Sequence, residues 1–332
     1  MKGGGLWALV VLLAGVLVAL TQGRTDIPLA DLGSLVWSML QGAPAPDEQV
    51  QTIVWQIRVP RTLAAIAVGA ALAVAGTAFQ GLFRNPLVSP DILGASGGAA
   101  LGAVLGIFFS FGVLGIQASA FAGGLLAVAL VYSVGSTVRH GDPVLVLILA
   151  GVVVGALLGA GIGMVKVLAD PYNQLPAMTF WLLGSLAGAH ASDLLPLLLP
   201  VLCGTAVLLL LRWRMDVMSL PEEEARALGA RTTLLRLLIV AAATLVTAAS
   251  VAAAGIVGWV GLVVPHLARF LVGPAFPRLL PTAALLGGGF LLFIDTLARS
   301  LAPVEIPLGI LTALIGSPFF IVLLRRASKG WM

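Results

Sequence analysis

The sequence is poor in charge, and it has very little cysteine and histidine. Only 10% of its 332 residues are charged, against about 25% in a typical soluble domain, whereas 60% are hydrophobic and the mean hydropathy is +1.10. A chain of this composition cannot cover a water-exposed surface, so we expect an integral membrane protein. The one cysteine, Cys203, excludes an intrachain disulfide and a cysteine-based metal site. The three histidines lack ligand spacing, and we expect no metal site.

The motifs of common enzymes are also missing. No GxxxxGK(S/T) phosphate loop occurs, so the chain is not expected to hydrolyse ATP itself. No set of serine, histidine and aspartate, and no pair of carboxylates, converges in a recognisable way. The net charge of +4 does not point to a nucleic-acid partner. The sequence thus predicts no catalytic residues and no cofactor bound by this chain.

Long apolar runs, separated by charges and by clusters of proline and glycine, dominate what is present. No alternating strand pattern recurs, so helices are expected to cross the membrane, each needing roughly 20 residues. The first run could also be a signal peptide, but it has no A-x-A-like cleavage site and is interpreted as a helix. The pattern predicts an all-α polytopic membrane protein, a single transmembrane domain over residues 1–332, with about ten helices at 6–22, 62–82, 92–110, 117–138, 143–168, 191–211, 233–251, 256–272, 281–298 and 307–324.

The distribution of the 18 basic residues predicts the orientation. If the N-terminus lies in the cytoplasm, most of them fall on the cytoplasmic side, an excess that is typical of inner loops. Ten helices then return the C-terminus to the cytoplasm as well. The inner set is Lys2, Arg84, Arg139, Arg212, Arg214, Arg226, Arg231, Arg236, Arg269, Arg278, Arg325, Arg326 and Lys329. The outer set is Arg24, Arg58, Arg61, Lys166 and Arg299.

The most polar segment is the predicted cytoplasmic loop at 212–232. Ser219 and Glu222 match an S-x-x-E capping box, Pro221 suits a first helical turn, and Gly229 is placed to end the helix. The pattern predicts a helix of roughly two turns, which is too short to be stable alone. It is either a solvated connector or a docking element for a cytoplasmic partner.

Glycines four residues apart mark one face of the predicted helix at 143–168. They favour either close helix packing or a smooth wall along a wide substrate path, and these two interpretations are compatible. The glycines are Gly151, Gly155, Gly159 and Gly163. A similar spacing in the preceding part of the chain, for which packing is the favoured interpretation, is formed by Gly98, Gly102 and Gly106.

Four stretches of the sequence together resemble the FecCD-type permease family. They are WQIRVPRTLAAIAVGAALAVAGTAFQGLFRNPLVSPDILGASGGA, EEEARALG, GIVGWVGLVVPHLAR and EIPLGILTALIGSPFF, and the resemblance that they mark, in this order, covers nearly the whole chain. The resemblance implies a membrane subunit of a binding-protein-dependent ABC importer for ferric siderophores, haem, cobalamin or molybdate. It also implies a type II ABC importer permease fold, in which helices two to five and seven to ten form an inverted repeat.

The resemblance further implies the partners and the location. A second copy of the chain would complete the pathway between two identical subunits. Two cytoplasmic ATPase subunits would bind ATP and Mg and perform the hydrolysis, and an external binding protein, periplasmic or lipid-anchored, would deliver the substrate. The expected location is the cytoplasmic (inner) membrane of a bacterium or archaeon, with both termini in the cytoplasm.

Residue roles follow from the resemblance by position. Asn85 and Leu87 match an inner gate, in a turn that Pro86 and Pro90 stiffen. The pathway role falls on Gly151, Gly155, Gly159, Gly163 and Lys166. The alternative for Lys166 is that its side chain only extends to the membrane surface. The ATPase-coupling role falls on Ser219, Glu222, Glu223, Glu224, Arg226 and Gly229. Docking of the binding protein falls on Arg58, Arg61 and Arg299, for which pairing with Glu305 is the alternative.

Two alternatives remain open at the level of the sequence. An iron-siderophore or haem is the preferred substrate, while cobalamin or molybdate and tungstate fit the same importer type. A protein of another class, an ion-coupled secondary transporter, would carry an ionisable residue deep in the membrane, and Asp295 is the best candidate for one. The polar loop at 212–232 favours the ATP-driven class.

Overall fold

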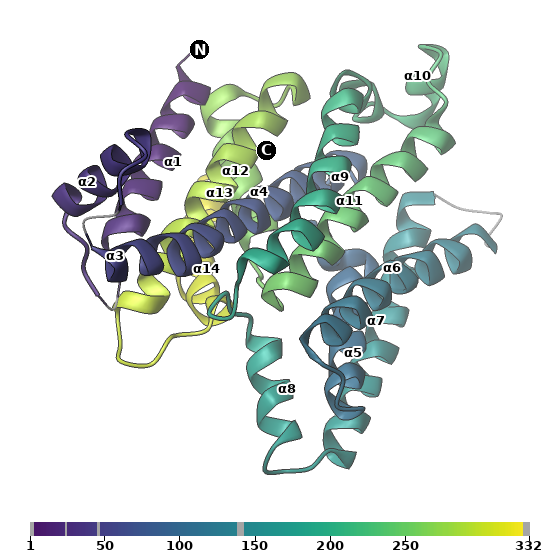
Figure 1. The fold of residues 1–332 in the computed structure, drawn as a ribbon. Coiled ribbons are helices and arrows are strands. Elements are labelled where there is room, and N and C mark those ends of the chain that lie inside the picture. Colours follow the sequence, from purple (N-terminus) through teal and green to yellow (C-terminus); the bar gives the residue numbers. More distant parts are fainter. Residues whose placement is uncertain (1–2, 24, 45–46, 138–142, 328–332) are drawn as a thin grey trace.

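The computed structural model describes residues 3–23, 25–44, 47–137 and 143–327, and the regular elements of this part of the chain are all helices (Figure 1). Seven of them in the described part are long and apolar enough to cross a membrane, and shorter apolar helices are α5, α12 and the part of α14 at Leu308–Val322. The predicted all-α membrane fold is confirmed. The helices at the predicted spans are α1 (Gly4–Thr21), α4 (Val59–Leu82), α5 (Ala95–Phe108), α6 (Val113–Thr137), α7 (Pro143–Leu168), α9 (Ala191–Met218), α11 (Thr232–Ala254), α12 (Val260–Val272), α13 (Phe276–Ser300) and α14 (Leu308–Ala327).

The core of the molecule is built around α4, which packs against α9, α11, α12 and α13. Small residues let these backbones touch: a Cβ added to Gly69 would lie 2.2 Å from the carbonyl oxygen of Gly287, and one added to Gly76 would lie 1.9 Å from that of Gly261. This is the small-residue packing by which helices associate in lipid. The glycine spacing at Gly98 has the same cause, because its Cβ would lie 2.3 Å from the carbonyl oxygen of Gly123 on α6.

Two halves of the chain repeat the same pattern of contacts. Helix α4 contacts α12 and α13, and α11 contacts α5 and α6 in the corresponding way. Each of these two long helices is followed by a break and then a short helix. The first break contains the 3-10 helix η2 (Pro90–Leu93) and Gly94 with φ of 78°, and the second contains Gly255 with φ of 68° and Trp259 with φ of 69°. This correspondence agrees with an inverted repeat.

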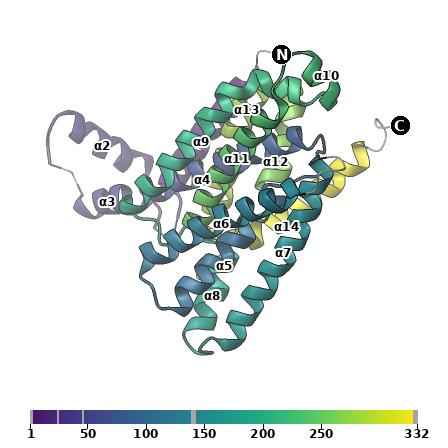
Figure 2. The ribbon, with the colours of Figure 1, turned by 90° about the vertical axis from the view of Figure 1, so that its right-hand side faces the viewer.

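The structure adds four elements that the sequence analysis did not predict. Three lie between the first two spans: α2 (Leu29–Leu40), α3 (Glu48–Thr52) and the π-helix η1 (Ile53–Arg58). They share a small apolar cluster around Leu35 and Val54 and lie to one side of the bundle (Figure 2). The fourth is α8 (Gln174–Leu183), at the opposite end of the molecule from α10 (Glu222–Ala227) (Figures 1 and 2). These helices are too short to span lipid, so a search for apolar runs misses them.

Several predicted boundaries shift. Helix α9 continues to Met218, so the first third of the predicted loop at 212–232 is helical. The break between α11 and α12 lies at 255–259. The predicted end of the fourth span at residue 138 lies outside the described residues, as do the ends of the chain on which the orientation of the termini depends.

Candidate functional site

The chain leaves α4 through a tight turn that carries the two predicted gate residues. Arg84 adopts a left-handed conformation with φ of 48°, and the N–H of Asn85 donates to the carbonyl oxygen of Gln80 at 3.1 Å. The Oδ1 of Asn85 then accepts a hydrogen bond from the N–H of Leu87 at 2.9 Å, which is the geometry of an Asx-turn. The side chain of Leu87 is 54% exposed. An amide that fixes the turn and an apolar side chain that projects from it therefore lie side by side.

Three polar side chains that the sequence analysis did not assign to the gate tie this turn to α12. Gln80 donates from Nε2 to the carbonyl oxygen of Leu262 at 3.2 Å and accepts from Nη1 of Arg269 at 2.6 Å. The ring of His266 is 3.0 Å from the carbonyl oxygen of Pro86. One sequence signal could have revealed the two residues of α12. In the segment PHLAR a histidine and an arginine, three positions apart, share one face of an apolar helix.

The short helix α10, which carries most of the residues predicted to couple to an ATPase, is held by an ion-pair network, and its predicted capping box is wrong. Glu222 pairs with Arg226 at 2.5 Å and with the buried Arg236 of α11 at 3.0 Å, and Thr232 donates to it at 3.2 Å. Because its carboxylate is engaged in this way, it does not turn back to cap the helix. Ser219 instead follows the last turn of α9 and donates to the carbonyl oxygen of Met215.

The pKa of Glu222 reflects the same network. Burial alone would raise it, but the hydrogen bonds and ion pairs with Arg236 and Arg226 outweigh burial and hold the pKa below its usual value. The carboxylate therefore stays charged at neutral pH.

The end of α10 matches its prediction. Gly229 has φ of 81°, its N–H donates to the carbonyl oxygen of Arg226 at 2.9 Å, and the N–H of Ala230 donates to that of Ala225 at 3.1 Å. These two bonds form a Schellman motif, which glycine favours because it has no Cβ to oppose a positive φ. The outer face of α10 presents the exposed side chains of Glu223, Glu224 and Leu228.

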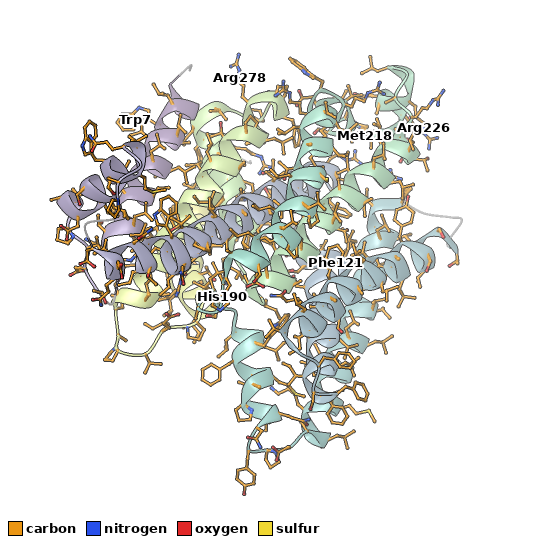
Figure 3. All side chains as sticks on the ribbon, in the orientation of Figure 1. Trp7, Phe121, His190, Met218, Arg226 and Arg278 are labelled. Carbon is orange, nitrogen blue, oxygen red and sulfur yellow. The ribbon has the colours of Figure 1, made fainter. Side chains whose placement is uncertain are left out.

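The turn that carries the predicted gate residues, here called the gate turn (residues 84–90), shares a small cavity with α10. Leu82 and Arg84 line it from the end of α4, and Glu222 and Arg236 line it from α10 and α11. The first turn of α7 and Met218 at the end of α9 complete the wall. Met218 and Arg226 lie at the same end of the molecule in Figure 3, and Arg278, also predicted to be cytoplasmic, lies at that end too. Two sites that are about 140 positions apart in the chain are thus separated by one layer of side chains.

The glycine face of α7 divides into two parts. A Cβ on Gly151 would lie 2.1 Å from the carbonyl oxygen of Ile92, so this glycine packs tightly against η2. Gly155, Gly159 and Gly163 have nothing within 4 Å of such a Cβ. Close packing therefore explains the first glycine, and for the other three the open-wall interpretation stays a prediction. Lys166 is half-buried near the end of the same helix.

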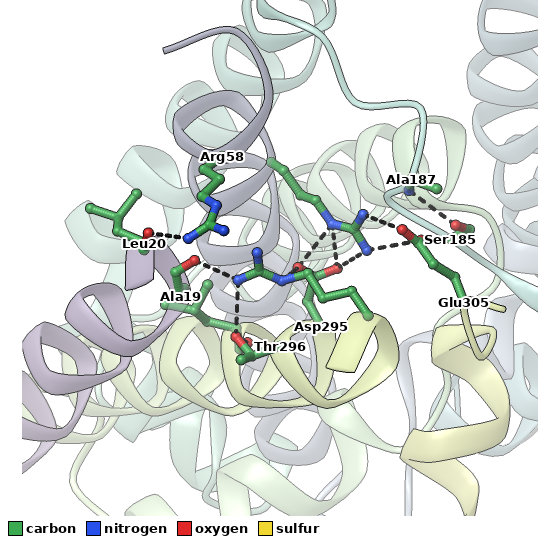
Figure 4. A network of polar contacts seen from close by, with 11 residues as sticks. Ala19, Leu20, Arg58, Ser185, Ala187, Asp295, Thr296 and Glu305 are labelled. Carbon is green, nitrogen blue, oxygen red and sulfur yellow. Dashed lines mark hydrogen bonds and ion pairs between the residues drawn. The ribbon is translucent and has the colours of Figure 1, made fainter. Parts of the chain in front are cut away.

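The three arginines predicted to dock a binding protein are buried within the chain. Arg61 pairs with Asp295 at 2.9 Å and with Glu305 at 2.9 Å, and Arg58 donates to the carbonyl oxygen of Leu20 (Figure 4). Arg58 also donates to the carbonyl oxygen of Thr25. Arg299 donates to the carbonyl oxygen of Ala19 at 2.6 Å and lies 3.8 Å from Asp295. The exposed fractions of Arg58, Arg61 and Arg299 are 4%, 7% and 8%.

This burial favours the alternative role for the arginines. A side chain that is already paired inside the chain cannot receive a carboxylate from outside without a rearrangement. Glu305, the alternative partner expected from the sequence, is bound by Arg61. The docking role stays a prediction, and the cluster is first of all a structural one that joins α1, η1, α4, α13 and the segment before α14.

Comparison with known proteins identifies the family, because the model of the FecCD transport family matches residues 11–326. The chain belongs to the FecCD transport family. This FecCD chain is 39% identical to the molybdate import system permease protein MolB of Haemophilus influenzae, over 99% of this chain and 96% of that one. It is 43% identical to the cobalamin import system permease protein BtuC of Halobacterium salinarum, over 96% of this chain and 87% of that one.

A solved structure agrees with the family. A metal-chelate type ABC transporter in an inward-facing conformation superposes with a TM-score of 0.89 and 37% identity, covering 98% of this FecCD chain and 100% of that chain. The fold of the chain is therefore that of an ABC transporter permease.

Proposed function

We propose that the chain is the membrane-spanning half of an ATP-driven importer in the cytoplasmic membrane of a bacterium or archaeon. One observation carries this proposal, the cavity that Glu222 of α10 and Arg84 of the gate turn line together. A displacement of α10 would reach the end of α4 through a single layer of side chains. The family and the solved transporter structure support the same division of labour between a permease and separate ATPase subunits.

The proposed complex contains a second copy of the chain. The face of α7 with Gly155 and Gly159 is open, and the apolar side chain of Val152, three positions before Gly155 and on the same face, is 62% exposed. Opposed across a two-fold axis, two such faces would form a pathway lined by small residues. Two ATPase subunits would dock on the exposed face of α10, and an external binding protein would dock at the far end of the pathway. Both termini would then lie in the cytoplasm.

The substrate class that we propose is a metal chelate, with an iron-siderophore or haem as the first choice. The stretch without Cβ atoms at Gly155, Gly159 and Gly163 suits a bulky solute because it leaves the pathway wide. The solved transporter of metal-chelate type supports this class. Molybdate is the second candidate, supported by the similarity to MolB, and Lys166 would attract either kind of anion.

The test is reconstitution of the chain in liposomes with its ATPase subunits and binding protein. We expect uptake of a chelate that depends on ATP, and we expect Glu223→Arg, which reverses a charge on the exposed face of α10, to abolish uptake without loss of protein from the membrane. Binding of ferric siderophore, haem, cobalamin and molybdate to the binding protein, measured by calorimetry, would separate the substrates. Uptake driven by an ion gradient in the absence of ATP would instead establish a secondary transporter.

A further inference from the structure

We propose that α12 is the anchor that sets the position of the gate turn, and that His266 is its positioning residue. The role of this turn as a gate rests on the proposed function, whereas the contacts between α12 and the turn do not depend on it. His266 donates a hydrogen bond to the carbonyl oxygen of Pro86 and so orients the peptide that precedes the exposed Leu87.

Helix α12 contacts the turn and its flanking residues at Gln80, Pro86 and Pro90. Gly261 packs against Pro90, because a Cβ on this glycine would lie 2.6 Å from the proline ring. The carbonyl oxygen of Leu262 accepts from Gln80, and the guanidinium of Arg269 donates to the same side chain. Positions 262, 266 and 269 are separated by four and three residues, which places them on one side of a helix. The turn is therefore held at its beginning, middle and end by a single element.

The bond of His266 has a defined chemistry. A carbonyl oxygen can only accept, so the hydrogen must be on Nε2, and the ring donates to Pro86 at 3.0 Å. The peptide that joins Pro86 to Leu87 is then fixed at both of its polar groups. Its oxygen is held by His266, and its N–H is held by the Oδ1 of Asn85 at 2.9 Å. Because a peptide is planar, two such bonds leave little freedom to the backbone that carries Leu87.

The ring of His266 also contacts the last helix. Its centroid is 5.9 Å from that of Phe320 on α14, and Phe320 is 6.3 Å from the ring of Trp259. Gly316 packs directly on Trp259, since a Cβ there would lie 2.8 Å from the tryptophan side chain. A movement of α14 therefore displaces the ring that holds Pro86. In this way α12 links the end of α14 to the gate turn.

The experiment is hydrogen–deuterium exchange of the purified complex, read on peptides that cover residues 84–92. In His266→Met the side chain keeps its bulk but loses its donor, and we expect exchange of the Leu87 amide to be about threefold to tenfold faster, the change that follows from losing one hydrogen bond of ordinary strength. His266→Gln keeps an N–H donor and should restore the wild-type rate. His190→Met is the matched control, because His190 lies at the start of α9, away from the turn. Equal exchange in wild type and His266→Met, or equal exchange in the Met and Gln variants, would overturn the inference.

A leak assay separates this inference from the proposed function. Liposomes with the resting complex should lose a small solute faster for both Leu87→Ala and His266→Met. If Leu87→Ala stays tight while exchange still rises in His266→Met, the gate proposal fails and the positioning role stands. If Leu87→Ala leaks while His266→Met neither leaks nor exchanges faster, the positioning role fails and the gate stands.

Discussion

Asp295 shows how the role of a single residue depends on partners that are remote in the sequence. As an acid within an apolar helix it was the candidate for an ion relay, yet its carboxylate is 1% exposed and lies between Arg61 and Arg299. A carboxylate that neutralises two buried guanidinium groups is a structural element of the fold. This arrangement removes the residue-level support for a secondary transporter.

We expect Asp295→Asn to destabilise the protein strongly, because it leaves Arg61 and Arg299 buried without their shared counter-charge. Breaking one partner of a buried ion pair costs roughly 3–5 kcal/mol. Thermal unfolding of the purified protein in detergent would measure the change. Glu305→Gln is the matched control with a smaller expected loss, because the carboxylate is 22% exposed and Arg61 keeps Asp295. Equal unfolding temperatures for Asp295→Asn and wild type would show that the cluster does not stabilise the fold.

The two kinds of glycine on α7 lead to opposite expectations for the same substitution. Gly151→Ala forces a methyl group against the backbone of Ile92 and should destabilise the protein by about 1–3 kcal/mol, the usual cost of overpacking. Gly159→Ala meets open space and should be neutral or slightly stabilising, since alanine favours a helix. The check is chemical or thermal unfolding of both variants. Equal losses for the two would contradict the division of this face.

At the scale of elements, α10 shows what a local pattern can and cannot predict. The stop at Gly229 was predicted from the sequence because a positive φ is a local requirement. The cap at the start of α10 was predicted wrongly for two reasons. Helix α9 continues to Met218, so Ser219 belongs to the end of that helix, and Arg236, fourteen positions away, binds Glu222. An S-x-x-E pattern cannot reveal a competing arginine on the next helix.

The network around Glu222 predicts a pH dependence of α10. Folding lowers the pKa of this carboxyl, so its ion pairs contribute in full above its unfolded pKa of about 4.3 and are lost as the pH falls through the lowered value. A spin label on Leu228→Cys, in a Cys203→Ser background, should become more mobile as the pH falls through that window. With Glu222→Gln the label should be mobile at neutral pH as well. A label that is equally ordered at neutral pH in both proteins would refute the network's role in holding α10.

At the scale of the whole molecule, the sequence was most informative about what meets lipid. Apolar runs predicted the spanning helices, because each helix must be apolar along its own length to cross the bilayer. Contacts between helices were not predictable in the same way: Arg61 meets Asp295 across 234 positions, and His266 meets Pro86 across 180. For the same reason, arginines expected on an outer surface are buried.

The proposed dimer makes a prediction that exploits the single cysteine. In a Cys203→Ser background, Val152→Cys, on the same face of α7 as Gly155 and Gly159 and 62% exposed, should form a disulfide between two copies on mild oxidation. Leu210→Cys on α9 is the matched control, since this leucine is also exposed, at 80%, but lies on another helix. The measurement is the covalent dimer on a non-reducing gel. Cross-linking at Leu210 and none at Val152 would place the contact between copies on a different face.

The two short helices after the breaks have a consequence for biosynthesis. Helices α5 and α12 have 14 and 13 residues, about 21 and 20 Å of rise, whereas the hydrocarbon layer is about 30 Å thick. Neither can leave the translocation machinery for lipid alone, because the backbone at its broken end would be without hydrogen-bond partners in hydrocarbon. Helix α5 must be retained until α6 has been made and can pack against it, whereas α12 can also pack against α4, which is made earlier. We therefore expect α5 and α6 to enter the membrane as one helical hairpin, for which the glycine contact between them is needed already during synthesis.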